Sequence, residues 1–135
     1  MDIRDLIMDL SAIERMLFVV GGGGAVGEMY GDGKTEPNFH DQWSMLECES
    51  WHFHLDMSLV KSIQFVEAED HGAPKIYYVR FADKSGDTLM RCYFPNPFLD
   101  NNEKITDFQP DKLKVFEVMK DRYTVCKGIE FIKRS

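Results

Sequence analysis

The sequence has no long apolar run and is short of basic residues, and each absence excludes a class of protein. No stretch approaches the roughly 18 consecutive apolar residues of a membrane-spanning helix, so we expect no membrane insertion. Sixteen Lys and Arg residues against 23 Asp and Glu give a formal net charge of −7. Because a phosphate backbone is bound by clustered cations, we also expect no nucleic-acid partner.

Cysteine is scarce as well. Cys48, Cys92 and Cys126 are widely spaced and form no C-x-x-C motif. The N-terminus is acidic and amphipathic, unlike the basic and then apolar start of a signal peptide. We therefore expect a cytoplasmic protein with reduced thiols. The 135 residues, 44% of them hydrophobic and 29% charged, match ordinary globular usage and predict a single domain over residues 1–135.

Helical periodicity is present near both ends of the chain. The first set of apolar residues at helical spacing is Ile3, Leu6, Ile7, Leu10 and Ile13, behind a cap at Asp2. The second set follows Pro110, a residue tolerated in a first helical turn, and consists of Leu113, Phe116, Met119 and Tyr123. We predict one helix near each terminus.

Between and after these helices the sequence alternates short apolar segments with turn residues. The predicted strands are 16–20, 25–30, 43–48, 50–56, 62–69, 76–82, 88–94 and 125–132. Residues 32–42 and 95–109 are polar and irregular, and turns are expected at 71–74 and 83–87. This order predicts an α+β fold with an antiparallel sheet of about seven to eight strands, an N-terminal helix and a C-terminal helix.

A glycine cluster separates the first two predicted strands. Gly22, Gly24 and Gly27 have the spacing of the dinucleotide-binding fingerprint. That fingerprint requires a helix after the glycines, whereas residues 26–30 have the pattern of a strand. We therefore predict a wide hairpin turn or a place where a ligand approaches the backbone closely.

The segment Trp51–Asp56 is the most informative for function. Side chains of a strand alternate between two faces, so His52, His54 and Asp56 share one face and the aromatic and aliphatic residues share the other. Three interpretations remain open. The histidines belong to a solvated face, or they bind Zn²⁺ or another divalent ion, or one of them is the axial ligand of a haem. His40 and Cys48 lie upstream and could join either site.

Two arginines bear on the haem interpretation. Arg80 and Arg91 lie on the adjacent strands of a predicted hairpin. A guanidinium group suits carboxylates such as haem propionates. The alternative is an ordinary exposed pattern of cross-strand charges.

The segments WHFHLDMSLVKSIQFVEAE and KIYYVRFADKSGDTLMRCYFPNP resemble the cytoplasmic haem-utilisation proteins of the ChuX/HutX type, which are related to each half of the HemS/ChuS proteins. The resemblance covers roughly residues 40–123. His54 falls at the histidine of the family's Gly-His strand, although Phe53 replaces the glycine. His40 corresponds loosely to a second family histidine, and 95–98 replaces a basic segment of the family.

The resemblance implies a homodimer that delivers, stores or traffics haem, with haem breakdown in some relatives. We expect a haem-binding protein for intracellular haem trafficking, storage or utilisation rather than an enzyme. His54 is then the axial ligand, with His52 or His40 as alternates, and Arg80 and Arg91 pair with propionates. A metal-binding domain or metal-dependent enzyme using His52 and His54, and a dimeric interaction module without ligand, are the alternatives.

Overall fold

The computed structural model describes residues 3–69 and 74–134. Its helices are α1 (Ile3–Ser11), the short 3₁₀ helix η1 (Met57–Leu59) and α2 (Pro110–Tyr123). Its strands are β1 (Leu17–Val20), β2 (Gly27–Tyr30), β3 (Asn38–His40), β4 (Trp43–Glu47), β5 (His52–Asp56), β6 (Ser62–Ala68), β7 (Ile76–Ala82), β8 (Thr88–Tyr93) and β9 (Ile129–Arg134). The α+β class and the two helices are confirmed.

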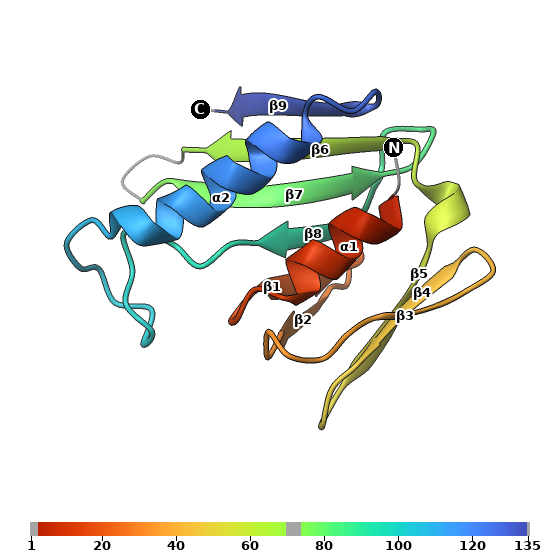
Figure 1. The fold of residues 1–135 in the computed structure, drawn as a ribbon, viewed down its shortest axis with the longest axis horizontal. Coiled ribbons are helices and arrows are strands. Elements are labelled where there is room, and N and C mark those ends of the chain that lie inside the picture. Colours follow the sequence, from red (N-terminus) through yellow and green to blue (C-terminus); the bar gives the residue numbers. More distant parts are fainter. Residues whose placement is uncertain (1–2, 70–73, 135) are drawn as a thin grey trace.

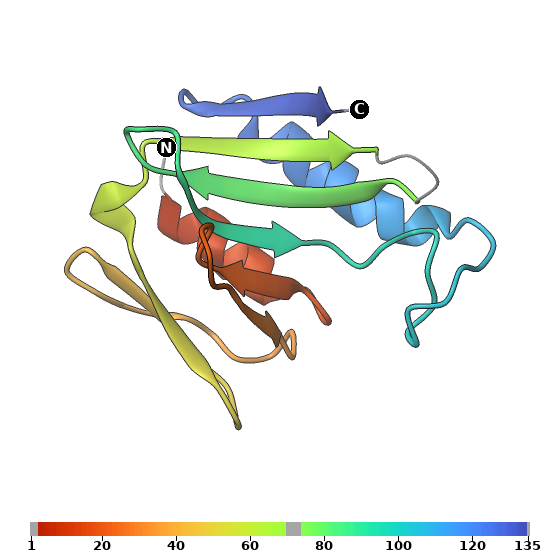
Figure 2. The same ribbon diagram turned by 180° about the vertical axis from the view of Figure 1, so that it is seen from behind.

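The strands form two sheets. Six of them pair in the order β2-β1-β8-β7-β6-β9, and the other three form a separate sheet in the order β3-β4-β5. All neighbours are antiparallel except β6 and β9, which are parallel. Figures 1 and 2 show α1 and α2 on one face of the six-stranded sheet, and no helix of the described residues on the opposite face.

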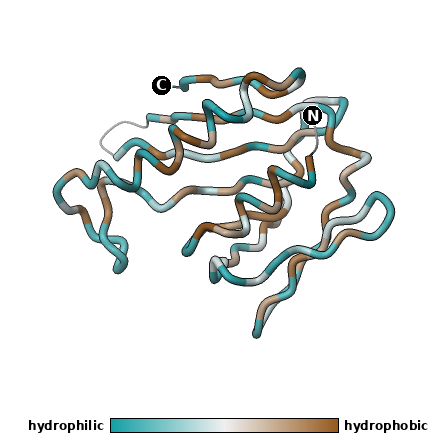
Figure 3. Tube along the Cα trace, in the orientation of Figure 1, coloured by the Kyte–Doolittle hydropathy of each residue, from teal (hydrophilic) through white to brown (hydrophobic). Residues whose placement is uncertain are grey.

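The core lies between the helices and the six-stranded sheet, and aromatic rings fill its centre. Phe116 of α2 is 1% exposed and meets Phe65, Tyr77 and Phe94 with ring centroids 5.9, 5.1 and 5.2 Å away. Such tilted and edge-on ring pairs are favourable arrangements of buried aromatics. Figure 3 shows hydrophobic and hydrophilic residues alternating along both helices, as expected for helices with one buried face.

Three details differ from the sequence prediction. Residues 32–42, expected to be a loop, contain the short strand β3. The closing strand begins at Ile129 rather than residue 125, because residues 124–128 are needed to turn the chain from α2 onto the edge of β6. The strands number nine in the described chain and are divided between two sheets. Asp2 and most of the turn predicted at residues 71–74 lie outside the described residues.

The glycine cluster forms the turn between β1 and β2, which pair as an antiparallel hairpin. Gly21 has a φ of 97°, a left-handed conformation that favours glycine. A Cβ atom on Gly22 would lie 2.4 Å from the carbonyl oxygen of Thr88. The close approach is therefore to strand β8, and the hairpin prediction is confirmed.

Candidate functional site

The outer face of the three-stranded sheet carries the three histidines named from the sequence. Residues paired across neighbouring strands point to the same face, and the pairing forms two complete rows: His40–Trp43–Asp56 and Asn38–Met45–His54. His52 faces the same way, opposite Glu47. The structure thus brings His40 onto the face of the His52/His54 pair.

The inner face of β5 is apolar, as the alternation predicts. Leu55 is 7% exposed, and the ring of Phe53 lies 5.3 Å from that of Phe18 in β1. Burial of this face fixes the register of the strand and turns both imidazoles outward. His52 and His54 are exposed, and their ring centroids are 5.6 Å apart.

His54 is distinguished from the other two histidines by a cleft. The cleft has a volume of about 290 Å³ and lies between β5 and the adjoining ends of β1 and β8. Its side chains are mostly apolar: Val20, Trp43, Phe53, Leu55, Leu59, Leu89 and Met90, together with His54 and Asp56. Trp43 and Leu59 are 40% and 51% exposed. Exposed apolar side chains gathered around one imidazole are typical of a surface that is covered by a ligand or a partner.

The same histidines have few possible partners for a metal ion. Within residues 3–69 and 74–134, no group of three or more His, Cys, Asp or Glu side chains is placed to hold a metal ion. The nearest carboxylate to His40 is that of Asp41, whose Oδ2 lies 3.5 Å from Nε2. A structural zinc site requires four ligands, and a catalytic one requires three from the protein.

Arg80 and Arg91 alternate along β7 and β8 with residues of the core, so their side chains lie on the opposite face of the sheet. No helix of the described residues covers that face (Figure 2). The two arginines are directly opposite each other on β7 and β8. Like charges in this position are destabilising. Thr88 Oγ1 accepts hydrogen bonds from both, at 2.7 Å from Arg80 Nε and 3.4 Å from an amino group of Arg91. Arg80 also donates to Gln64 and to the Gly86 carbonyl, so most of its donors are used within the fold.

A third arginine joins this pair. Arg134 of β9 lines the same depression as Arg80 and Arg91, with a volume of about 290 Å³, and donates a hydrogen bond to the Tyr78 hydroxyl at 3.0 Å. Among the described residues no carboxylate forms an ion pair with any of the three. Three guanidinium groups that form no ion pair with the described residues, in a protein of net charge −7, form a surface suited to an anion.

Strand β8 connects the histidine cleft to the arginine depression. Leu89 and Met90 line the cleft, while Thr88 and Arg91 line the depression. Leu89 and Arg91 are two residues apart on one strand, which corresponds to roughly 7 Å. Met90 and Arg91 are adjacent on the strand, so their side chains point to opposite faces of the sheet. A ligand that contacts both places would have to pass the end of β8 at Thr88.

Several residues of this region were not identified from the sequence. Trp43 and Leu59 border His54, and Arg134 completes the arginine group. The alternation of β4, in which Trp43 and Met45 point to the same face, was a usable signal for the first of these. Leu59 and Arg134 join through tertiary structure, and local patterns carry no signal for that.

Comparison with known proteins gives structural matches but no curated relative. No curated protein matches the sequence, whereas a protein family model matches residues 4–125. A structure from Agrobacterium tumefaciens is 19% identical with a TM-score of 0.71, covering 90% of this chain and 66% of that one. Two ChuX structures are 13% and 12% identical, with TM-scores of 0.67 and 0.65.

Each ChuX match covers 85% of this chain, and 68% or 69% of the ChuX chain, so the protein spans about two-thirds of the length of these structures. At these identities the matches describe the fold alone. Each of these structures superposes on most of this chain, and the family model also covers most of it. The chain belongs to the family whose model matches residues 4–125, and it shares the fold of the ChuX structures.

Proposed function

We propose that the protein binds haem and serves in haem trafficking, storage or utilisation rather than in catalysis. One observation carries the proposal: His54 is among the residues that line a mostly apolar cleft, with Trp43 and Leu59 exposed at its side. Histidine is a common axial ligand of haem iron, and an apolar surround suits the porphyrin. One of the similar structures is that of a haem-binding ChuX protein. No helix in the described part of the chain is long and apolar enough to cross a membrane.

The group of Arg80, Arg91 and Arg134 supports the same proposal, because guanidinium groups suit the propionates of a haem. Haem carries two carboxylates, and Arg91 lies two residues from the cleft residue Leu89 on β8. Arg91 has more free donors than Arg80, which is held by Thr88, Gln64 and the Gly86 carbonyl. We therefore assign direct propionate pairing mainly to Arg91 and a positioning role to Arg80.

The test is a titration of untagged protein with hemin, followed by the Soret band. Wild type is compared with His54→Ala, His52→Ala and His40→Ala. The last two are matched controls, because they remove an imidazole from the same sheet face but not from the cleft. We expect near-stoichiometric binding that only His54→Ala weakens strongly. Weak, non-saturating binding that none of the substitutions alters would contradict the proposal.

The propionate assignment needs a separate comparison. Arg91→Gln is expected to weaken binding of hemin about tenfold, as for the loss of a charge-assisted hydrogen bond, and to leave binding of the hemin dimethyl ester unchanged. Lys84→Gln, at an exposed position of the β7–β8 turn, removes the same charge outside the depression and is the control. Equal losses for hemin and its ester would show that Arg91 does not pair with the carboxylates.

A homodimer is the expected assembly, and the size of the cleft supports it. About 290 Å³ is at the lower limit of ordinary small-molecule sites, so one subunit encloses little of a porphyrin. A second copy placed over the exposed face of His54 and Trp43 completes the enclosure. Sedimentation velocity with and without hemin tests this. A monomer in both states would contradict it.

The alternative of a metal site on His52 and His54 is tested by metal analysis of the untagged protein. Bound Zn²⁺ or another divalent ion that is lost in both His52→Ala and His54→Ala would favour it. Absence of both metal and hemin binding would leave the dimeric module without ligand.

A further inference from the structure

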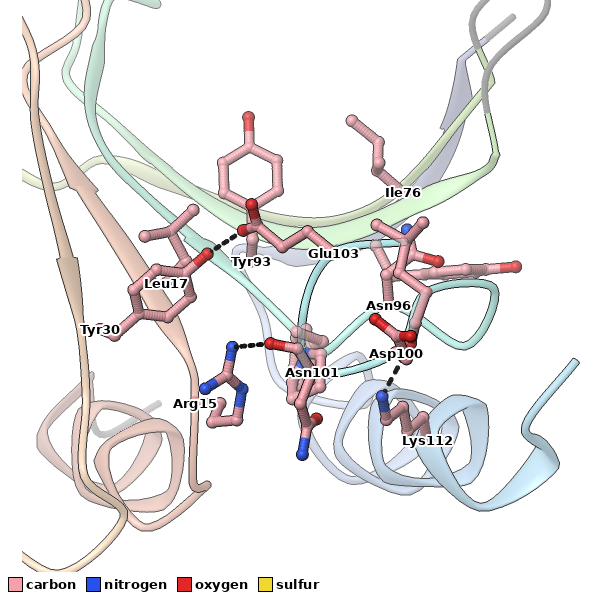
Figure 4. A pocket seen from close by; sticks show the side chains of 14 residues that line it. Arg15, Leu17, Tyr30, Ile76, Tyr93, Asn96, Asp100, Asn101, Glu103 and Lys112 are labelled. Carbon is pink, nitrogen blue, oxygen red and sulfur yellow. Dashed lines mark hydrogen bonds between the residues drawn. The ribbon is translucent and has the colours of Figure 1, made fainter. Parts of the chain in front are cut away.

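A second cavity lies at the other end of strands β1 and β8. Its volume is about 160 Å³, and its apolar walls include Leu17, Tyr93, Phe94 and Leu99. Arg15 and Lys112 lie at its border (Figure 4). The histidine cleft is lined by Val20 and Leu89 of the same two strands. The two sites therefore share strands but no residues.

The loop between β8 and α2 covers this cavity and is tied down by two contacts across it. Tyr30 of β2 hydrogen-bonds the carboxylate of Glu103, and Arg15 donates to the backbone carbonyl of Asn101 at 3.1 Å (Figure 4). Arg15 and Glu103 have φ angles of 66° and 61°, and they are two of the three non-glycine residues in the described chain with a left-handed backbone. Such conformations concentrate at binding sites, where the surrounding structure holds them in place.

The two cations at the cavity are not paired with its carboxylates. Neither Arg15 nor Lys112 forms an ion pair with a carboxylate of the described residues. Their hydrogen bonds go to neutral backbone carbonyls, those of Asn101 and Leu99. The two carboxylates nearby are already engaged, since Glu103 accepts from Tyr30 and Asp100 accepts from the amides of its own loop. A guanidinium group with unused donors beside an apolar chamber is suited to a carboxylate.

The size of the cavity limits the rest of the ligand. An apolar protein cavity of roughly 150 Å³ holds one benzene ring, and a porphyrin is far larger. We propose that this cavity binds a small monocarboxylate with a single aromatic or branched apolar group, with the apolar group between Leu17 and Tyr93 and the carboxylate on Arg15. The site is separate from the haem site and does not depend on the haem proposal.

Benzoate is the probe, and benzamide is its neutral isostere. Binding is followed by ¹H–¹⁵N NMR at constant ionic strength and pH. We expect benzoate to give saturable shifts at residues around the cavity and benzamide to bind at least about tenfold more weakly, because it lacks the charge-assisted hydrogen bond. Arg15→Gln is expected to reduce benzoate to the affinity of benzamide. The control Lys84→Gln removes the same charge at the opposite end of the sheet and should change neither affinity.

A second variant tests the chamber itself. Leu17→Phe fills it and is expected to weaken benzoate and benzamide alike, whereas Arg15→Gln acts on the carboxylate alone. Signals of residues away from the cavity that keep their wild-type positions show that each variant is folded. Tyr93→Leu is used in place of a variant that does not fold. Equal binding of the two probes, or shifts unaffected by both substitutions, would overturn the proposal. An equal loss in Lys84→Gln would mean that benzoate responds only to overall charge.

Discussion

Phe116 is the residue whose removal should most weaken the attachment of α2 to the six-stranded sheet. Its ring meets Phe65, Tyr77, Phe94 and Phe131, with centroids between 5.1 and 6.3 Å away. These four rings come from β6, β7, the end of β8 and β9. Phe116 therefore joins the helix to most of the sheet at once, and Phe116→Ala leaves a void that all of these elements border.

The expected cost follows from burial. Replacing a fully buried Phe by Ala costs about 3–5 kcal/mol, including the cavity left behind. The ring is 1% exposed and has aromatic neighbours on several sides. Because favourable ring pairs contribute beyond area burial, we expect the upper part of that range, about 4–5 kcal/mol. Total stabilities are about 5–15 kcal/mol, so the variant should be folded but only marginally stable.

The assay is urea unfolding followed by far-UV circular dichroism, with the midpoint and slope both fitted. Val118→Ala, at a position of the same helix that is 46% exposed, is the matched control and should change stability by less than about 0.5 kcal/mol. A loss below about 2 kcal/mol for Phe116→Ala would refute the packing argument. A changed slope together with a changed midpoint would instead indicate that the two-state description fails.

Three further outcomes are expected. Gly22→Ala should cost about 1–3 kcal/mol in urea unfolding, because the added Cβ would meet the Thr88 carbonyl, whereas Gly23→Ala, with open space around its Cβ, should cost nothing. Burial raises the pKa of the Cys92 thiol, so a thiol reagent should modify the other two cysteines of the native protein and spare this one. Burial, and then a hydrogen bond to a carboxylate, raise the pKa of Tyr123; stability should therefore be intact below the ordinary tyrosine pKa of about 10 and fall above it, and Tyr123→Phe should flatten that fall. Midpoints unchanged between Gly22→Ala and wild type, three reactive thiols, or an alkaline slope retained in Tyr123→Phe would each contradict the corresponding argument.

Most of the fold was predictable because local patterns agree with tertiary burial. The alternation in β5 turns Phe53 and Leu55 inward, and the predicted bounds of β7 match the structure. The division into two sheets was not predictable, since no local pattern states which strands pair. Strand β3 has three residues and a single apolar side chain, Phe39, too short for an alternation to be recognised. The parallel pairing of β9 depends on where α2 ends in space.

The candidate haem site was predictable only in its histidines. The spacing of His52 and His54 on a strand predicted a shared face, and the structure has that face. The cleft beside His54 depends on η1, which directly follows β5, and on the ends of β1 and β8, which lie far from it in the sequence. The second cavity was not predictable from the sequence. Arg15 and Glu103 adopt left-handed backbone conformations there, and without a glycine at either position the sequence does not indicate them.

The two candidate sites can be tested independently, because they lie at opposite ends of β1 and β8. Leu17 lines the second cavity and Val20 lines the histidine cleft. These residues are three apart on β1, which corresponds to roughly 10 Å. Substitutions separated by this distance, with no shared partner, are usually additive. Arg15→Gln should therefore leave the hemin titration unchanged, and His54→Ala should leave benzoate binding unchanged. If either substitution alters both, the ligands compete or the strands move between two arrangements, and a titration of one ligand in the presence of the other separates these cases, because competition alone prevents both from being bound at once.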